Sequence, residues 1–362
     1  MSLDFSIKEL AMMALLLDED NIINTRGVRV ARRRMWIHPS LLGRKIEGEY
    51  YTLYRHLIND EEKFLQYCRM DVGTFEMILK KITPKIVKRN TRFREAISPR
   101  EKLIVCLRFL STGDSYKTIA FSYRLGHSTV QNIVTEVCTA INEILMTEFI
   151  PTPSREKWLQ IADDMWTMWN FPNCLGALDG KHVAIDAPSN SGSLYFNYKK
   201  SFSVVLLALV DANYKFIAVD IGSYGKNSDG GILTNSALGR GLENGTLNVP
   251  ESSPLPGTNI LTPYVILGDE AFALKTYMMR PYPKANVQDD EKIIFNYRLC
   301  RGRRLVECAF GILSQTFRVY CRRLKADPRN ATSIILTTCI LHNITLGNTQ
   351  NFPGKIHIVF RR

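Results

Sequence analysis

The chain has 362 residues, of which 45% are hydrophobic, and its 47 Lys and Arg exceed its 35 Asp and Glu to give a net charge of +12 at pH 7. This composition is ordinary for a globular protein with a sizeable core, and the positive charge favours a polyanionic partner such as DNA. A membrane span is not expected, because the apolar runs at 203–210 and 265–267 are too short to cross a bilayer. A zinc site is not supported either, because the 8 cysteines include no Cys-x-x-Cys pair.

The first residues show no secretory signal. Met1–Asp18 contains acids and lacks a basic segment before its apolar run. We therefore expect reduced, mostly buried thiols and a location in the nucleus, with the cytoplasm as the other reducing compartment consistent with the sequence.

Residues 1–95 are expected to form a helical N-terminal region with a basic segment. An amphipathic stretch at 1–24 precedes five clustered arginines, which are Arg26, Arg29, Arg32, Arg33 and Arg34. The cluster is either a nuclear import signal or phosphate-binding arm, or else a solvated basic linker. From Glu49 to Lys88 apolar residues recur at three- and four-residue steps, which indicates helices. Pro84 and the charged stretch after it are expected to end this block.

Residues 96–148 carry the pattern of a helix-turn-helix module. Ala120 is a small residue where two helices could cross, Gly126 lies in the turn, and Ser128 is the expected N-cap of the next helix. The polar side chains expected on its exposed face, and therefore predicted to bind DNA, are Thr129, Gln131 and Asn132. The alternative is an ordinary helical hairpin without a role in recognition.

Residues 149–170 are expected to form a helical connector, and residues 171–347 the largest domain. The predicted strands of this domain are at 174–186, 201–211, 214–222 and 264–268, and its predicted helices are at 229–243, 271–279, 291–319 and 331–345. Three strands with tight connections, followed by a helix and a strand that crosses back, indicate an α/β (α+β) fold with a mixed sheet. Residues 348–362 are left as a tail.

Three acids lie in or beside apolar segments, where a carboxylate is unusual. Asp179 lies in the apolar stretch 173–185, Asp269 ends the apolar run 263–268, and Glu307 lies on a helix with an apolar stripe. A buried acid is unfavourable unless it is paired, hydrogen-bonded or bound to a metal. Two strand-end aspartates and a helical glutamate suit divalent cations, which take oxygen ligands. The alternative for Asp179 is a hairpin turn, since Asp-Gly is a strong turn dipeptide.

Cationic residues lie close to these acids along the chain. Lys181 follows Asp179, and four arginines lie within about two turns of Glu307, namely Arg298, Arg301, Arg303 and Arg304. We predict that these cations attract DNA phosphates, the alternative being a charged outer face. Asp229 is an additional acid that ranks below the three.

Nine sequence blocks between Trp36 and Asn343 resemble, in the same order, the PIF/Harbinger superfamily of DDE transposases and the nucleases derived from Harbinger transposases. The blocks are Ala177–His182, Asn197–Lys199 with Phe202–Leu206, Val210–Ala212, Ser228–Gly231, Gly268–Phe272, Pro281–Pro283, Phe295–Leu299, Val306–Glu307 with Ala309–Leu313, and Leu341–Asn343. The resemblance implies an RNase H-like catalytic domain in which Asp179, Asp269 and Glu307 are the catalytic and metal-binding residues.

The resemblance also implies a metal-dependent DNA endonuclease that cleaves, and in a transposase also transfers, strands at transposon-like ends, with two Mg²⁺ or Mn²⁺ ions. It implies a separate Myb/SANT-like partner protein, while the oligomeric state, including a homo-oligomer, stays open. The rival interpretation is a domesticated, catalytically silent nuclear protein that keeps the fold and DNA binding. Departures from the family in this helix and in the tail leave room for it. Cys300 and Gly302 stand where Ser and Ala are usual, Cys308 stands where Asn is common, and the end from Asn351 does not resemble a family terminus. Gly302 inside the helix costs roughly 1 kcal/mol relative to Ala.

Overall fold

The computed structural model describes residues 38–92, 95–283, 285 and 289–349. The chain divides into two compact units, Met1–Gly43 and Arg44–Arg362. Within the first unit the described part contains one short helix, α2 (Pro39–Leu42). The predictions for residues 1–24, for the arginines at 26–34 and for the tail from 350 onwards concern residues outside the described part of the chain.

The second unit begins with a bundle of helices. Their bounds are α3 (Arg44–Glu47), α4 (Glu49–Thr52), α5 (Tyr54–Leu57), α6 (Glu61–Cys68), α7 (Val72–Ile86), α8 (Pro99–Thr112), α9 (Tyr116–Tyr123) and α10 (His127–Phe149). The helical character predicted for Glu49–Lys88 is confirmed. The predicted end of this block is confirmed as well, because α7 ends at Ile86, between Pro84 and the charged stretch that begins at Lys88, although Pro84 itself lies inside the last turn of the helix. Ile82 and Ile86 on either side of it are fully buried, so core packing holds the turn.

A five-stranded mixed sheet follows, with the order β3-β2-β1-β6-β7. The strands are β1 (Cys174–Ala184), β2 (Ser203–Val210), β3 (Phe216–Tyr224), β6 (Val265–Leu267) and β7 (Met278–Met279). β1 pairs antiparallel with β2 and parallel with β6. Every residue of β2 is buried, as expected for a central strand covered on both faces. A separate two-stranded ribbon joins β4 (Ser253–Pro254) to β5 (Leu261–Thr262).

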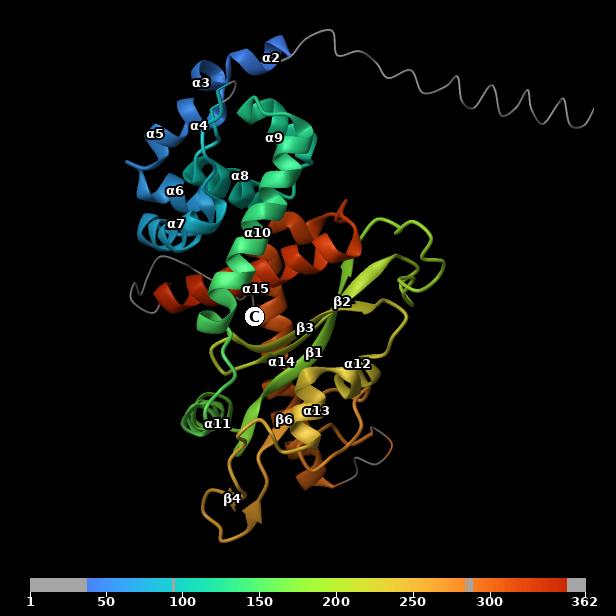
Figure 1. Cartoon of the computed structure of the whole chain (residues 1–362). Helices are drawn as coiled ribbons and strands as arrows, with labels where there is room; N and C mark the ends of the chain where they lie inside the picture. The colour runs from blue at the N-terminus through green and yellow to red at the C-terminus, as the bar shows by residue number, and fades with distance from the viewer. Residues whose placement is uncertain (1–37, 93–94, 284, 286–288, 350–362) are drawn as a thin grey trace, which may run out of the picture. The chain divides into compact units, whose positions relative to one another are not determined.

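Helices cover both faces of the sheet (Figure 1). They are α11 (Arg155–Trp169), α12 (Asp229–Asn235), α13 (Ala237–Glu243), α14 (Asp290–Thr316) and α15 (Pro328–Thr349), and a 3₁₀ turn, η2 (Arg318–Cys321), precedes α15. Phe216 and Ile217 are neighbours on β3, and their side chains point to opposite faces of the sheet. The Phe216 ring lies 4.8 Å from the ring of His342 in α15, whereas Ile217 lines a cavity with Ala237 and Leu238 of α13.

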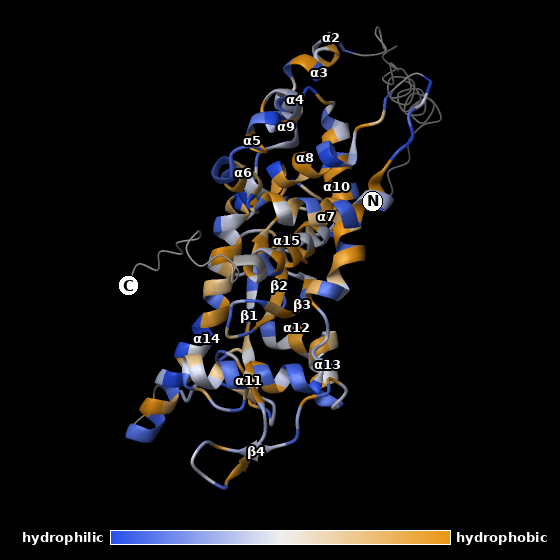
Figure 2. Cartoon of the chain, turned by 90° about the vertical axis from the view of Figure 1, so that its left-hand side faces the viewer, coloured by the Kyte–Doolittle hydropathy of each residue, from blue (hydrophilic) through white to orange (hydrophobic). Residues whose placement is uncertain are grey.

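The helical bundle and the sheet share one core, because α10 packs along α15. Asn142 Nδ2 donates to the carbonyl of Ser333 at 3.0 Å, and Thr337 Oγ1 donates to the carbonyl of Cys138 at 3.3 Å. In Figure 2 the hydrophobic residues gather where the sheet and α15 lie. The second helix of the predicted helix-turn-helix region, α10, is therefore packed into the core of the sheet domain.

Two predicted elements differ from the structure. The helix predicted at 271–279 is wrong: these residues form turns and then the short strand β7. Met278 instead pairs with Ile266, which extends the sheet beyond β6. The helix predicted at 229–243 is divided at Ser236, whose side chain caps α13 by accepting from Gly239 N.

The fold class predicted from the sequence is confirmed. An antiparallel β1-β2-β3 meander, a parallel β6 beside β1 and helices on both faces form an RNase H-like mixed sheet after a helical region.

Candidate active site

Asp179 lies in the middle of β1, opposite Ala208 of β2. Its Oδ1 accepts a hydrogen bond of 2.8 Å from Gly180 N. Burial, together with the charges of Asp269 and Asp229, raises the pKa of Asp179 from 3.8 to about 6, while the hydrogen bond from Gly180 and the charge of Arg303 oppose the rise. Asp179 is thus an acid in a strand that other acids approach, and the hairpin-turn alternative is wrong.

Asp269 lies beside this strand, two residues after β6 ends. Its Oδ1 accepts a hydrogen bond of 2.9 Å from Ala271 N, which fixes the carboxylate in a turn. Its neighbour Glu270 is exposed. The parallel pairing of Ala177 with Leu267 brings the end of β6 alongside β1, so Asp179 and Asp269 lie near each other.

Glu307 lies on α14 and is not part of this group of acids. Its Oε1 forms an ion pair of 2.8 Å with Arg303 Nη2, one helical turn away, and 48% of its side chain is exposed. In the part of the chain that the structure describes, no group of three or more Asp, Glu, His or Cys side chains is placed to hold a metal ion. The predicted three acids therefore do not converge in this arrangement.

Asp229 does lie near Asp179 and Asp269, although the sequence analysis placed it below the three predicted acids. It is the first residue of α12, where Ser228 Oγ accepts from Gly231 N at 3.3 Å. A Cβ atom on Gly180 would lie only 2.2 Å from Asp229 Oδ1, so the carboxylate rests directly on the backbone of β1. Burial raises the pKa of Asp229, as does the charge of Asp269. The sequence signal was the block Ser228–Gly231, an N-cap followed by an acid and two small residues.

The predicted cations do not gather at one place: four are arginines on α14 that point in different directions, and Lys181 lies on β1. Lys181 points towards this helix, with its ammonium 5.7 Å from the ring centre of Phe310, and burial lowers its pKa. The Arg301 guanidinium lies 5.8 Å from the ring centre of Trp169, and Arg304 is exposed. Only Arg303 is both paired with Glu307 and close enough to act on the pKa of Asp179.

The predicted helix-turn-helix consists of α9, a turn of three residues and α10. Ala120 is buried where the helices meet, and the side chains of Gln131 and Asn132 are exposed, while Thr129 is half-buried. The N-cap prediction is wrong: α10 starts at His127 with Gly126 as its cap. The side chain of Ser128 is therefore exposed on the first turn.

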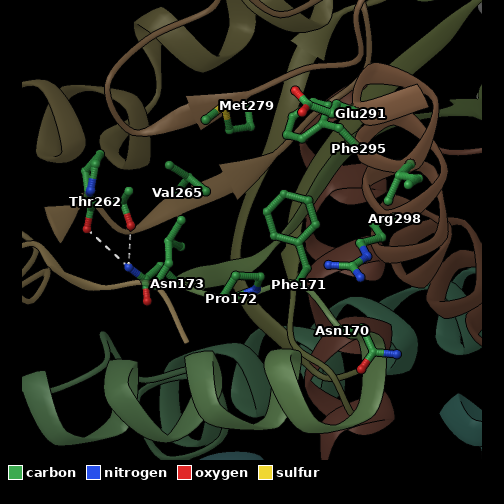
Figure 3. Close-up of a pocket in the computed structure, with 13 residues that line it drawn as sticks. Asn170, Phe171, Pro172, Asn173, Thr262, Val265, Met279, Glu291, Phe295 and Arg298 are labelled. Carbon is green, nitrogen blue, oxygen red and sulfur yellow. Dashed lines mark hydrogen bonds between the residues drawn. The ribbon is translucent and has the colours of Figure 1, made fainter. Parts of the chain in front are cut away.

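An apolar cavity of about 460 Å³ lies towards the other end of β1 and β6, beside the first turns of α14 (Figure 3). Phe171, Val265 and Phe295 line it, and Arg298 and Glu291 are its charged residues. Asn173 Nδ2 donates to Thr262 Oγ1 at 2.8 Å on one wall. Since Asn173 and Val265 come before the acids on their strands, this cavity is separate from them.

The fold and these residues define an RNase H-like domain with a half-buried acid, Asp179, on its central strand and two further acids, Asp269 and Asp229, close to it. Residues 178–343 match the family described as DDE superfamily endonuclease. This match, together with the relatives below, confirms the predicted resemblance to Harbinger-type DDE endonucleases.

The curated relatives cover most of the chain. Protein ALP1-like of Arabidopsis thaliana is 26% identical over 297 residues, which is 79% of this chain and 71% of that protein. The protein named "Putative nuclease HARBI1" of Homo sapiens is 26% identical over 271 residues, which is 72% of this chain and 71% of that protein. No solved structure matches the chain significantly.

These similarities support a nuclease or transposase-derived function for this chain. Within residues 38–92, 95–283, 285 and 289–349, no helix combines the length and the apolar character that crossing a membrane requires.

Proposed function

We propose that the chain is a metal-dependent DNA endonuclease of the DDE transposase type, with Asp179, Asp269 and Glu307 as its metal-binding and catalytic residues. One observation carries the proposal: the carboxylate of Asp179 is held mid-strand, with the carboxylates of Asp269 and Asp229 close enough to raise its pKa. Crowded, partly buried acids are unfavourable by themselves and become favourable when a cation lies between them.

The donor chemistry of the residues fits Mg²⁺ or Mn²⁺, because carboxylate oxygens are the ligands that hard cations take. Asp179 and Asp269 would hold the cations, and Glu307 would complete the site after leaving Arg303. That exchange needs a rotation of side chains within one helical turn, since the ion pair spans positions i and i+4. Two bound ions would stabilise the attacking and leaving oxygens of an in-line displacement.

The cations of the chain have their own proposed roles. Arg303, once released by Glu307, would contact the phosphate next to the cleaved bond, and Lys181 would do so from β1. Arg298, Arg301 and Arg304 would contact phosphates further along the strand. Gln131, Asn132 and Thr129 would contact DNA through α10, with a Myb/SANT-like partner assisting recognition in the nucleus.

The rival function is a catalytically silent DNA-binding protein that keeps the fold. The ion pair between Arg303 and Glu307 is the observation that favours it, because it keeps the third carboxylate away from the other two. The two functions differ in metal affinity, since a silent protein needs no carboxylates that bind a cation.

Mn²⁺ titration calorimetry and a cleavage assay on plasmid DNA would test the proposal. Asp179→Asn, Asp269→Asn and Glu307→Gln should each lose cleavage and weaken Mn²⁺ binding, and the control Glu270→Gln should keep both, because Glu270 is exposed beside Asp269. If Mn²⁺ binding is lost in Glu270→Gln but not in Glu307→Gln, the third ligand is Glu270 and the proposed role of Glu307 is wrong. Wild-type protein that binds no Mn²⁺ and cuts no DNA would support the rival function.

A further inference from the structure

The connection between β1 and β2, residues 185–202, ends in a tightly organised turn that we name the Tyr198 loop (residues 195–203). Its centre is Asn197, whose side chain is only 4% exposed. Asn197 Oδ1 accepts from the backbone N–H groups of Lys199 at 2.9 Å and Ser201 at 3.1 Å. Asn197 Nδ2 donates to Ser203 Oγ at 2.8 Å. A buried amide with this many partners holds the loop in one conformation.

The loop presents an aromatic ring to solvent. Tyr198 is 78% exposed, which is far more than packing against the domain would require. The Lys199 ammonium lies 5.3 Å from the centre of its ring. The neighbouring side chains of Phe196, Lys199 and Lys200 are also exposed. Exposed rings interleaved with lysines are the combination with which proteins bind unpaired nucleic-acid strands.

The position of the ring places it close to the acids. Tyr198 packs edge-on against His182, with 5.4 Å between the ring centres. His182 is anchored in turn by a hydrogen bond of 2.9 Å between its Nδ1 and Ser203 Oγ. His182 lies on the face of β1 opposite to the Asp179 side chain, which is the face where Asp229 meets the backbone at Gly180. The charge of Lys199 opposes the rise in the pKa of Asp229, so the loop lies near this acid.

We propose that Tyr198 is a stacking site for an unpaired nucleobase beside the cleaved phosphodiester bond, with Lys199 contacting the adjoining phosphate. The inference rests on the proposed function, because it takes the acids around Asp179 as the place of cleavage. Stacking recognises the flat face that all bases share, so the site requires an unpaired base rather than a particular sequence. It would favour DNA that is frayed or distorted next to the cut.

The test uses the full chain in Ca²⁺ and two fluorescent DNA probes. One is a forked duplex with 2-aminopurine in its unpaired arm, and the other is the same duplex fully paired. Tyr198→Ala and Tyr198→Leu should bind the forked probe about tenfold more weakly, and the fluorescence change of 2-aminopurine should disappear. Tyr198→Phe keeps the ring and should behave as wild type, as should Tyr297→Ala, which removes another exposed aromatic side chain. All variants should bind the paired probe equally.

Lys199→Gln gives a second measurement. Loss of one phosphate contact should lower the slope of log Kd against log salt concentration by about one.

Two results would overturn the inference. One is a Tyr198→Leu protein that binds the forked probe as wild type does, since apolar bulk would then suffice. The other is a Tyr198→Ala protein that loses affinity equally for both probes, since the side chain would then contact the backbone or support a protein partner. Cleavage is measured separately in Mn²⁺, so a wild-type protein that cuts no DNA refutes the proposed function while the fluorescence result still decides the stacking site.

Discussion

Replacing Asp179 with Asn should stabilise the metal-free protein at neutral pH. Burial and two neighbouring acids raise the pKa of Asp179 from 3.8 to about 6. The folded state therefore binds the proton more tightly than the unfolded state, and stability falls as the pH rises through this range. One pKa unit corresponds to about 1.4 kcal/mol, so the ionised carboxylate costs the fold roughly 3 kcal/mol at pH 7.5 and about 1 kcal/mol at pH 4.5.

Asn removes this cost because it carries no charge, and its Oδ1 can still accept from Gly180 N, as Asp179 does at 2.8 Å. Urea unfolding in EDTA at the two pH values measures the effect as a difference in free energy of unfolding. Asp179→Asn should exceed wild type by up to about 3 kcal/mol at pH 7.5 and by clearly less at pH 4.5. Asp163→Asn, a change in an exposed carboxylate on α11, is the control.

The reasoning would be refuted by a variant that is no more stable than wild type at pH 7.5. It would also be refuted by a gain of equal size at both pH values, because a charge effect has to follow ionisation. Adding Mn²⁺ should reverse the order of stabilities, since the cation binds the folded wild type and stabilises it by mass action.

Three further predictions concern other parts of the chain. Burial lowers the pKa of His342 from 6.5 to about 4, so the folded protein should lose roughly 3 kcal/mol as the pH falls through this range, and His342→Gln should lose much less in acid unfolding curves. Gly180→Ala should weaken Mn²⁺ binding measured by calorimetry, because the added Cβ would lie 2.2 Å from a carboxylate oxygen of Asp229. Gly311→Ala adds a Cβ that meets no atom within 4 Å, so this helix substitution should raise the free energy of unfolding by about 0.5–1 kcal/mol. Gln131→Ala and Asn132→Ala should reduce the ratio of affinities for transposon-end and random DNA without changing the cleavage rate of bound DNA, and an unchanged ratio would assign recognition elsewhere.

The sheet was predictable because its strands are continuous apolar runs with clear ends, and the predicted bounds of β2 and β6 differ from the structure by at most two residues. The residues at 271–279 were not predictable in this way. Their apolar residues suit a short helix, but the pairing of Met278 with Ile266 decides the conformation, and that pairing depends on a neighbouring strand.

The candidate site shows the same division between local and tertiary information. The ion pair of Glu307 with Arg303 could have been foreseen, because their i, i+4 spacing on a helix is visible in the sequence. The approach of Asp229 could not, since it depends on α12 meeting the backbone of β1 at Gly180. Sequence patterns thus identify which acids are unusual, and only the fold shows which of them meet.

The packing of α10 on α15 sets a condition on how the protein is made. α10 leaves the ribosome roughly 180 residues before α15, which is about 10 to 40 s at ordinary rates of synthesis. During that time the side of α10 that carries Asn142, which bonds to Ser333 and Thr337 of α15 in the finished fold, has no partner from α15. A nascent chain of this protein therefore displays this side of α10 to chaperones until α15 emerges and packs against it.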